Sequence, residues 1–263
     1  MNSSDWLAYF RQNQLDRRGI SWHEGIRLDP RLTVPLARSL ARFQLGESSD
    51  GAHLRFRARR LAQKTGDAAY ADAIELFIAE EQEHARLLAK VLHQLHAPLL
   101  RHHWSDWLFR RCRHLLGFYE EISVLLIAEI IALKYYGVIR EGCRAPVLET
   151  VCEQILADEK FHVRFHCERF HEVIARRSKP VRAAWWWALT GMFAAACTVV
   201  AWDHRRAFRA LGSSALVFLG ESSLNFLAAR DAIFLGVPFA RGAAEQAPSG
   251  LSSDHHHFPF SPA

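Results

Sequence analysis

Two segments of this sequence place a Glu-x-x-His pattern inside an otherwise apolar helical stripe. In AEEQEHARLL (79–88), Glu81 and His84 fill the gap in a stripe that runs from Ile78 to Leu88. Residues at i and i+3 share one face of a helix, so both side chains are expected to point inward with the stripe. Because a buried charge is costly unless it is paired, these side chains need partners.

The second segment, LADEKFHVRFH (156–166), repeats the pattern. Glu159 and His162 interrupt a stripe that contains Ile155 and Val163. A single buried Glu-x-x-His is compatible with a histidine that is hydrogen-bonded in a core. Two copies on two predicted helices instead indicate a common partner, and a dication neutralises several buried carboxylates at once.

Two further predicted helices each carry one inward glutamate. Glu129 lies within LLIAEIIAL, and Glu47 follows Leu40 and Phe43 at helical spacing. Together with the two Glu-x-x-His pairs, this makes a set of carboxylates and imidazoles that suits a pair of metal ions bridged by carboxylates.

Helical periodicity is nearly continuous along the 263 residues, and no alternating strand pattern occurs between tight turns. The expected helices are 4–18, 33–63, 67–95, 117–136, 146–177, 181–210 and 214–235, with a crossover at 97–116. The expected divisions are an N-terminal helix and loop (1–32), a helical bundle (33–178), an apolar helical annex (179–241) and a disordered tail (242–263). The histidines at 255–257 are interpreted as a polar run of that tail, with loose metal binding as the alternative.

Over about 33–177 the chain resembles the ferritin-like di-iron carboxylate superfamily. EEQEHA and DEKFHV are especially similar to the paired motifs of soluble acyl-carrier-protein desaturases. The resemblance implies an all-α, ferritin-like four-helix bundle with a crossover between its second and third helices, followed here by a C-terminal apolar helical hairpin. It also implies a site for two Fe ions, with Mn or a mixed Mn/Fe pair as alternatives, held by Glu47, Glu81, His84, Glu129, Glu159 and His162.

Some assignments stay open. The letters LGESS surround Glu47 and recur around Glu221, so Glu221 is a rival ligand. In the family, the acid that precedes each ligand glutamate often hydrogen-bonds a ligand histidine, which here points to Glu80 and Asp158. The alternative interpretation is that Glu80 and Asp158 are exposed carboxylates on the protein surface. His166, one turn after His162, is a candidate ligand or hydrogen-bond donor, and a satisfied core histidine is the favoured interpretation.

The chain also departs from the patterns of the families that it resembles. Leu88 stands where a radical-forming tyrosine is found in ribonucleotide reductase, and Tyr136 is no clear substitute. Ala132 and Leu133 stand where many monooxygenases place a threonine, so the pocket for O₂ is expected to be apolar. No CxxC-type rubredoxin segment is present, so an external electron donor is expected. Ferritin cages are built from shorter chains, which argues against iron storage.

Residues 183–202 form an uncharged run with Trp185–Trp187 at one end and Trp202 at the other. Its length and tryptophan placement suit membrane contact, whereas burial against the bundle and the helix at 214–235 is the favoured interpretation. In either arrangement the hairpin is expected to shape a channel for an apolar substrate.

We therefore expect an O₂-dependent di-iron oxidoreductase that acts on an apolar small molecule. The alternatives are a ferroxidase-type or non-catalytic metal-binding protein and a membrane-associated scaffold. The net charge of +5 comes with no clear nucleic-acid motif. Five scattered cysteines and an N-terminus without an apolar signal core suit a reducing, cytoplasmic location, with association at the inner face of the membrane left open. A homodimer is compatible with the sequence, which identifies neither substrate nor catalytic residues.

Overall fold

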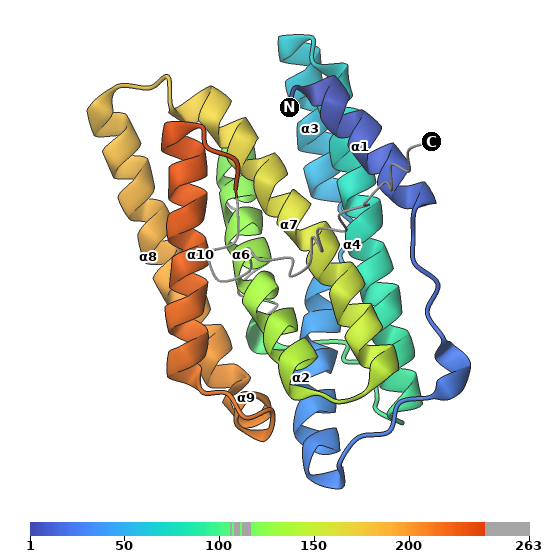
Figure 1. Ribbon diagram of the computed structural model, residues 1–263. Coiled ribbons are helices and arrows are strands. Elements are labelled where there is room, and N and C mark those ends of the chain that lie inside the picture. The colour runs from blue at the N-terminus through green and yellow to red at the C-terminus, as the bar shows by residue number, and fades with distance from the viewer. Residues whose placement is uncertain (106, 108–110, 112–116, 240–263) are drawn as a thin grey trace, which may run out of the picture.

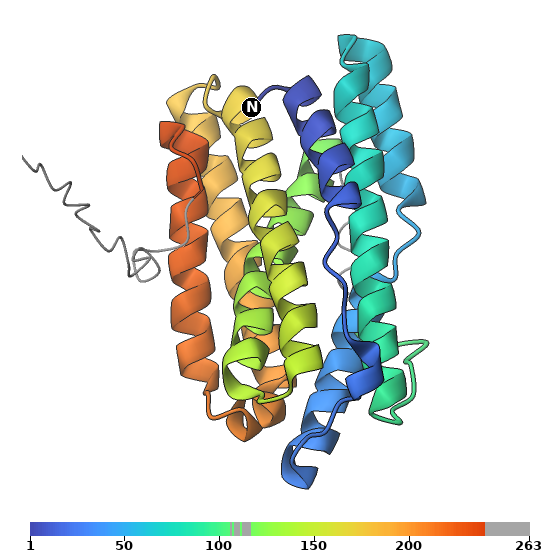
Figure 2. The ribbon, with the colours of Figure 1, turned by 45° about the vertical axis from the view of Figure 1, so that its right-hand side comes forward.

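The computed structural model of the protein describes residues 1–105, 107, 111 and 117–239. Every regular element among these residues is a helix, and the long helices lie side by side (Figures 1 and 2). The expected all-α class is therefore confirmed. Part of the predicted crossover and the predicted tail from 242, with His255–His257, lie outside the described residues.

Residues 1–94, all of which the structure describes, contain four α-helices and one short 3-10 helix. They are α1 (Ser3–Leu15), η1 (Trp22–Glu24), α2 (Pro30–Glu47), α3 (Ala52–Thr65) and α4 (Ala68–Gln94). Helix α4 packs against α1, α2, α3 and α7. Asp67 caps the start of α4 by accepting a hydrogen bond from the backbone of Tyr70, close to the predicted boundary.

The single helix predicted for 33–63 is wrong, because the chain breaks into α2 and α3 directly after Glu47. Gly51, between the two helices, adopts φ +68°, and a Cβ atom there would lie 2.6 Å from the side chain of Ile78 on α4. Only glycine combines this backbone conformation with so close an approach. The break places Glu47 at the last residue of α2.

Two long helices form the centre of the molecule. They are α6 (Phe118–Gly142) and α7 (Pro146–Ile174), and they pack along each other. Helix α6 continues beyond its predicted end at 136, since the burial of Val138 and Ile139 outweighs the propensity cost of Gly137, about 1 kcal/mol. It ends at Gly142, where a Cβ atom would lie 2.5 Å from the carbonyl oxygen of Leu211.

The C-terminal part comprises α8 (Lys179–Asp203), α9 (Arg205–Ala210) and α10 (Ala215–Leu235). The helix predicted for 181–210 is thus interrupted at His204, whose buried ring interacts with the hydroxyl of Ser39 on α2 at 2.6 Å. Helix α10 packs against α7 and α6, while α8 packs against α10 and α6 at the edge of the molecule (Figures 1 and 2).

Among the residues that the structure describes, two helices are long and apolar enough to cross a membrane, α6 and α8, and they differ in burial. The most apolar window of α6 is 94% buried, whereas that of α8 is only 17% buried. One face of α8, with Leu189, Phe193 and Cys197, packs into the protein, and Phe193 stacks on Phe226 of α10 at 4.2 Å. Residues 183–202 were expected to be buried against the rest of the protein. The structure shows such burial for one face of α8 only.

Candidate metal centre

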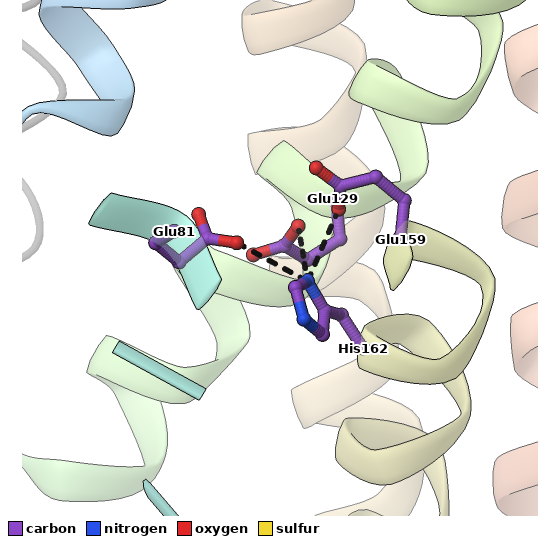
Figure 3. Close-up of side chains that lie close together, drawn as sticks. All are labelled: Glu81, Glu129, Glu159 and His162. Atoms are coloured by element: carbon purple, nitrogen blue, oxygen red, sulfur yellow. Dashed lines mark ion pairs between the residues drawn. The ribbon is translucent and has the colours of Figure 1, made fainter. Parts of the chain in front are cut away.

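Six of the predicted site residues meet in the interior, although they come from four different helices. Two overlapping groups have ligand atoms within 4.8 Å of one another. One contains Glu81, Glu129, Glu159 and His162, which face one another in Figure 3. The other contains Glu47, His84 and Glu159. Since Glu159 belongs to both groups, the six residues form one continuous cluster, which we call the carboxylate cluster.

Each histidine turns its Nδ1 atom toward the carboxylates. His162 Nδ1 lies 3.1 Å from Glu81, 3.4 Å from Glu159 and 3.7 Å from Glu129 (Figure 3). His84 Nδ1 lies 3.5 Å from Glu159 and 3.6 Å from Glu81. Glu81 and Glu159 therefore stand between the two imidazole rings.

The opposite nitrogen of each ring donates a hydrogen bond to an acid on the other helix. His84 Nε2 on α4 donates to Asp158 on α7, and His162 Nε2 on α7 donates to Glu80 on α4, each over 2.9 Å. Both acids are almost fully buried. A carboxylate that accepts from Nε2 directs the Nδ1 lone pair of the neutral ring into the carboxylate cluster. Glu80 and Asp158 are thus buried rather than exposed, and each forms a hydrogen bond with a histidine.

Helix α1 and the segment that follows it add two residues that the sequence analysis missed, Asn13 and Arg17. Asn13 Nδ2 donates to Glu80 over 2.7 Å and to Asp158 over 2.8 Å. The guanidinium of Arg17 lies 3.2 Å from Glu80 and also binds Asp158 directly. The available signal was their i, i+4 spacing in the helix predicted for 4–18, which ends at Leu15 in the structure. That spacing does not reveal that the two side chains cover Glu80 and Asp158.

The carboxylate cluster leaves its inward atoms without hydrogen-bond partners. The buried atoms without a partner among the described residues include both carboxylate oxygens of Glu159, Oε1 of Glu81 and the Nδ1 atoms of His84 and His162. Such atoms are costly to bury unless something binds them. Carboxylate oxygens and imidazole nitrogens are ligands that proteins use for divalent metals, so these residues could hold a metal ion.

Without a metal ion, protons on the buried carboxylates reduce the negative charge of the carboxylate cluster. Burial raises the pKa of Glu47 well above its ordinary value, and the charges of Glu81 and Glu159 raise it further. Burial also raises the pKa of Glu129, again with help from Glu159 and Glu81. Charging all four carboxylates in one dry site is costly, so burial favours the protonated forms of Glu47 and Glu129.

The histidines carry the positive charge of the metal-free cluster. Burial lowers the pKa of His84, but its hydrogen bond to Asp158 and the nearby Glu159 outweigh burial and raise the pKa to about 10. Burial likewise lowers the pKa of His162, and the surrounding carboxylates raise it well above its ordinary value. For Glu159 the effect of burial is outweighed by its neighbours, and its pKa lies below the ordinary value.

The structure separates Glu47 from its rival Glu221. Glu47 lies in the carboxylate cluster and accepts a hydrogen bond of 3.0 Å from the hydroxyl of Tyr136. Glu221 lies on α10, where its half-exposed carboxylate pairs with the buried Lys134 of α6. Glu221 is therefore not part of the carboxylate cluster, and Tyr136, which the sequence left without a role, contacts a member of it.

His166 differs from the interpretation as a satisfied core histidine. It is fully buried, and neither ring nitrogen has a hydrogen-bond partner in the described part of the chain. Its ring lies 5.1 Å from that of Phe77, and it belongs to neither metal-binding group. Burial and the charge of His162 lower its pKa to about 3, so the ring is neutral.

A cavity of about 360 Å³ adjoins the carboxylate cluster and is lined by α2, α4, α6 and α8. Its polar end contains Glu47, Glu81 and Glu129. Most of the remaining wall is apolar, and Arg42, Ser49, Ser105 and His204 add the other polar groups. The size lies in the range of small-molecule pockets, about 300–1,000 Å³. Ala132 belongs to the wall, as expected for an apolar surface in place of threonine.

No protein-family model, curated protein or solved structure matches this chain.

Proposed function

We propose that this chain is a ferritin-like four-helix-bundle protein that holds two Fe ions and uses O₂ to oxidise an apolar small molecule. The observation that carries the proposal is the convergence of buried carboxylate and Nδ1 atoms that lack hydrogen-bond partners. In this assignment α2, α4, α6 and α7 are the bundle helices, and α2 and α6 each contribute one glutamate. Helices α4 and α7 each contribute Glu-x-x-His, which is the ligand pattern of di-iron carboxylate bundles.

The charges of the carboxylate cluster support two dications rather than one. Four ionised glutamates and two neutral histidines balance two dications, whereas with one dication the buried site is neutral only if two of the glutamates keep their protons. Glu159 belongs to both groups of ligand atoms, so it is the residue that we expect to contact both ions. When bound, a pair of Fe(II) ions supplies the electrons that activate O₂.

The protein's own contribution is to position the ligands and exclude water. Glu80 and Asp158 hold the imidazole rings so that both Nδ1 atoms face inward. The apolar cavity beside Glu129 offers an uncharged molecule a place next to the carboxylate cluster. Tyr136 donates a hydrogen bond to Glu47, and Glu47 lines this cavity. Residues that deliver electrons are expected on a separate donor protein.

The cavity favours oxidation of an organic substrate over a ferroxidase-type or purely metal-binding role. A ferroxidase needs an iron-entry route, whereas the wall here presents mainly hydrocarbon side chains such as Phe77, Ile78 and Leu125. The substrate itself is expected to be apolar, since charged groups would lose their hydration in such a cavity.

The test begins with anaerobic loading of Fe(II) and measurement of the metal content. We expect about two ions per chain, following the ligand count of paired sites. Glu81→Ala or Glu159→Ala should remove most of the metal. O₂ is then added in the presence of a lipid and metabolite extract, and mass spectrometry follows the products. A wild-type protein that binds no metal contradicts the proposal. Two bound ions without oxidation of any organic compound indicate the ferroxidase-type alternative.

A further inference from the structure

We propose that the exposed apolar face of α8, together with α10, binds the surface of an anionic lipid bilayer and receives the apolar substrate from it. The role of the cavity in this inference rests on the proposed function, whereas the membrane binding does not. We define the α8 face by its exposed residues, which are Ala184, Trp187, Ala188, Gly191, Ala194, Ala195, Thr198 and Trp202.

The α8 face is uncharged along its whole length. No charged residue occurs between Arg182 and Asp203. Two large side chains mark its ends, Trp187 with 72% of its surface exposed and Trp202 with 64%. Tryptophan favours the boundary between lipid and water because its ring is apolar and its N–H group is polar. An exposed apolar strip of this length in a protein indicates a contact with a partner or a membrane.

Helix α10, which packs beside α8, extends the apolar surface. Its exposed leucines include Leu216 at 80%, Leu224 at 61% and Leu235 at 71%. Its charged residues are mostly paired within the protein, since Glu221 binds Lys134 and Arg230 binds Asp231. The apolar part of the surface therefore covers two neighbouring helices.

Basic residues flank the α8 face at both ends. Arg176, Arg177 and Lys179 are exposed where α7 leads into α8, and Arg206 and Arg209 are exposed on α9. A basic residue close to an anionic membrane contributes about 1 kcal/mol of binding free energy. The same charges argue against a second copy of the chain as the occupant. If two α8 faces met, basic ends would meet basic ends in either a parallel or an antiparallel arrangement.

The packing of α8 fixes how it meets the bilayer. Leu189, Phe193 and Cys197, on the side opposite the α8 face, are buried in the protein. A helix that keeps one side in protein contact lies along the bilayer surface with its other side immersed, rather than crossing it alone.

The α8 face leads directly to the cavity. Ala195 is exposed on this face and also lines the cavity, together with Met192, Ala196 and Val199 of the same helix. The cavity continues from these residues to Glu129 and Glu81 in the carboxylate cluster. An apolar molecule dissolved in the bilayer would thus reach the cluster without crossing water.

The experiment is flotation of the full-length protein with vesicles, either phosphatidylcholine alone or phosphatidylcholine mixed with phosphatidylglycerol. We expect the wild-type protein to float with the mixed vesicles and to bind pure phosphatidylcholine at least tenfold more weakly. The double variant Ala188→Glu/Ala194→Glu should reduce binding at least tenfold, since both charges fall on the α8 face and outside the cavity wall. The second variant, Trp187→Ser/Trp202→Ser, removes both exposed tryptophans without adding a charge, and it should also reduce binding.

Phe56→Glu is the matched control, because Phe56 is 63% exposed on α3, which does not form part of this surface. It should float like the wild type. The proposal is overturned if the wild-type protein fails to float, or if both surface variants float unchanged. It is also overturned if sedimentation shows a dimer that Ala188→Glu/Ala194→Glu dissociates. Metal content measured on the same samples separates the two proposals, since flotation does not depend on metal.

Discussion

The hydroxyl of Tyr136 on α6 donates a hydrogen bond of 3.0 Å to Glu47 at the end of α2. The sequence analysis assigned no role to Tyr136 and left Glu221 as an alternative to Glu47. The hydrogen bond links Tyr136 to Glu47. Burial raises the pKa of Tyr136 well above its ordinary value, and the charge of Glu47 raises it further, so the phenol keeps its proton. Tyr136 therefore stabilises Glu47 in one orientation.

Tyr136→Phe should weaken metal binding at the half of the site that contains Glu47 and His84. Loss of one buried hydrogen bond costs about 1 kcal/mol, which corresponds to about fivefold in affinity. Titration with Fe(II) or Mn(II) under anaerobic conditions measures this. Tyr135→Phe is the matched control, because the hydroxyl of Tyr135 bonds Ser39 and not the carboxylate cluster. Equal effects of both variants would show that Tyr136 acts on stability alone.

Glu47→Gln and Glu221→Gln should have opposite outcomes. Glu47 lies in the carboxylate cluster, so replacing it should remove one metal ion or slow the reaction with O₂ sharply. Glu221→Gln only removes a half-exposed partner of Lys134, which should lower stability by about 1–3 kcal/mol and leave the metal content unchanged. Metal analysis and denaturant unfolding distinguish the two, and a metal-deficient Glu221→Gln variant would reverse the assignment.

Arg17→Ala should weaken metal binding although Arg17 touches none of the proposed ligands. Its guanidinium binds both Asp158 and Glu80, which orient His84 and His162. Loss of partners that act through ligating histidines reduces metal affinity by roughly 10- to 100-fold, and the lower end is expected here because Asn13 still holds both acids. Competition with a chelator of known affinity measures the change.

Arg18→Ala is the control for that experiment. Arg18 is largely exposed and pairs only loosely with Glu153, at 3.6 Å, so its removal should leave metal binding as in the wild type. Arg17→Lys should restore part of the affinity, because it keeps the charge and loses the second arm of the guanidinium. Unchanged binding in Arg17→Ala would limit the role of Arg17 to attachment of α1.

The inward faces of the helices were the predictable part of the site. Glu81, His84, Glu159 and His162 interrupt apolar stripes, and burial of the stripe carries such residues into the interior regardless of loop details. The arrangement around them depends on tertiary contacts. The break at Gly51 depends on the approach of Ile78 from another helix, which has no signal in the local sequence.

In the C-terminal hairpin, too, the sequence did not identify which side chains are buried. Leu216 and Leu227 belong to the helix predicted for 214–235, and both are exposed in the structure although they are apolar. Helix α10 buries Phe218, Ala229 and Ile233 instead, because α7 and α6 offer the larger surface. In a helix that is apolar all round, periodicity alone does not identify the buried face.

His166→Phe should leave the metal content unchanged and keep or raise stability. His166 is buried with both ring nitrogens unpartnered, and an aromatic hydrocarbon of similar shape removes that penalty, about 1–3 kcal/mol. Chemical denaturation and metal analysis test both parts. A loss of metal in His166→Phe would instead identify His166 as a ligand.

Metal binding should release protons and strengthen as the pH rises. In the metal-free cluster burial favours protons on Glu47 and Glu129, and the surrounding carboxylates favour protons on His84 and His162, so the pKa of each group is raised. Each must lose its proton before it ligates a cation. Calorimetric titration in buffers of different ionisation enthalpy counts the released protons, and a release near zero at pH 7 would contradict this protonation pattern.

The stability of the metal-free protein should fall over the same range of pH. The folded pKa of His84, about 10, lies above its ordinary value, so its contribution is fully present below about pH 6.5 and is lost as the pH rises toward 10. The raised pKa values of Glu47 and Glu129 act in the same direction, since ionising them in the buried site destabilises the fold. Bound metal should remove this loss, because the cation then replaces the protons. Unfolding by urea at pH 6, 8 and 10, with and without Mn(II), measures the difference, and equal slopes in the two series would show that the carboxylate cluster does not bind the ion.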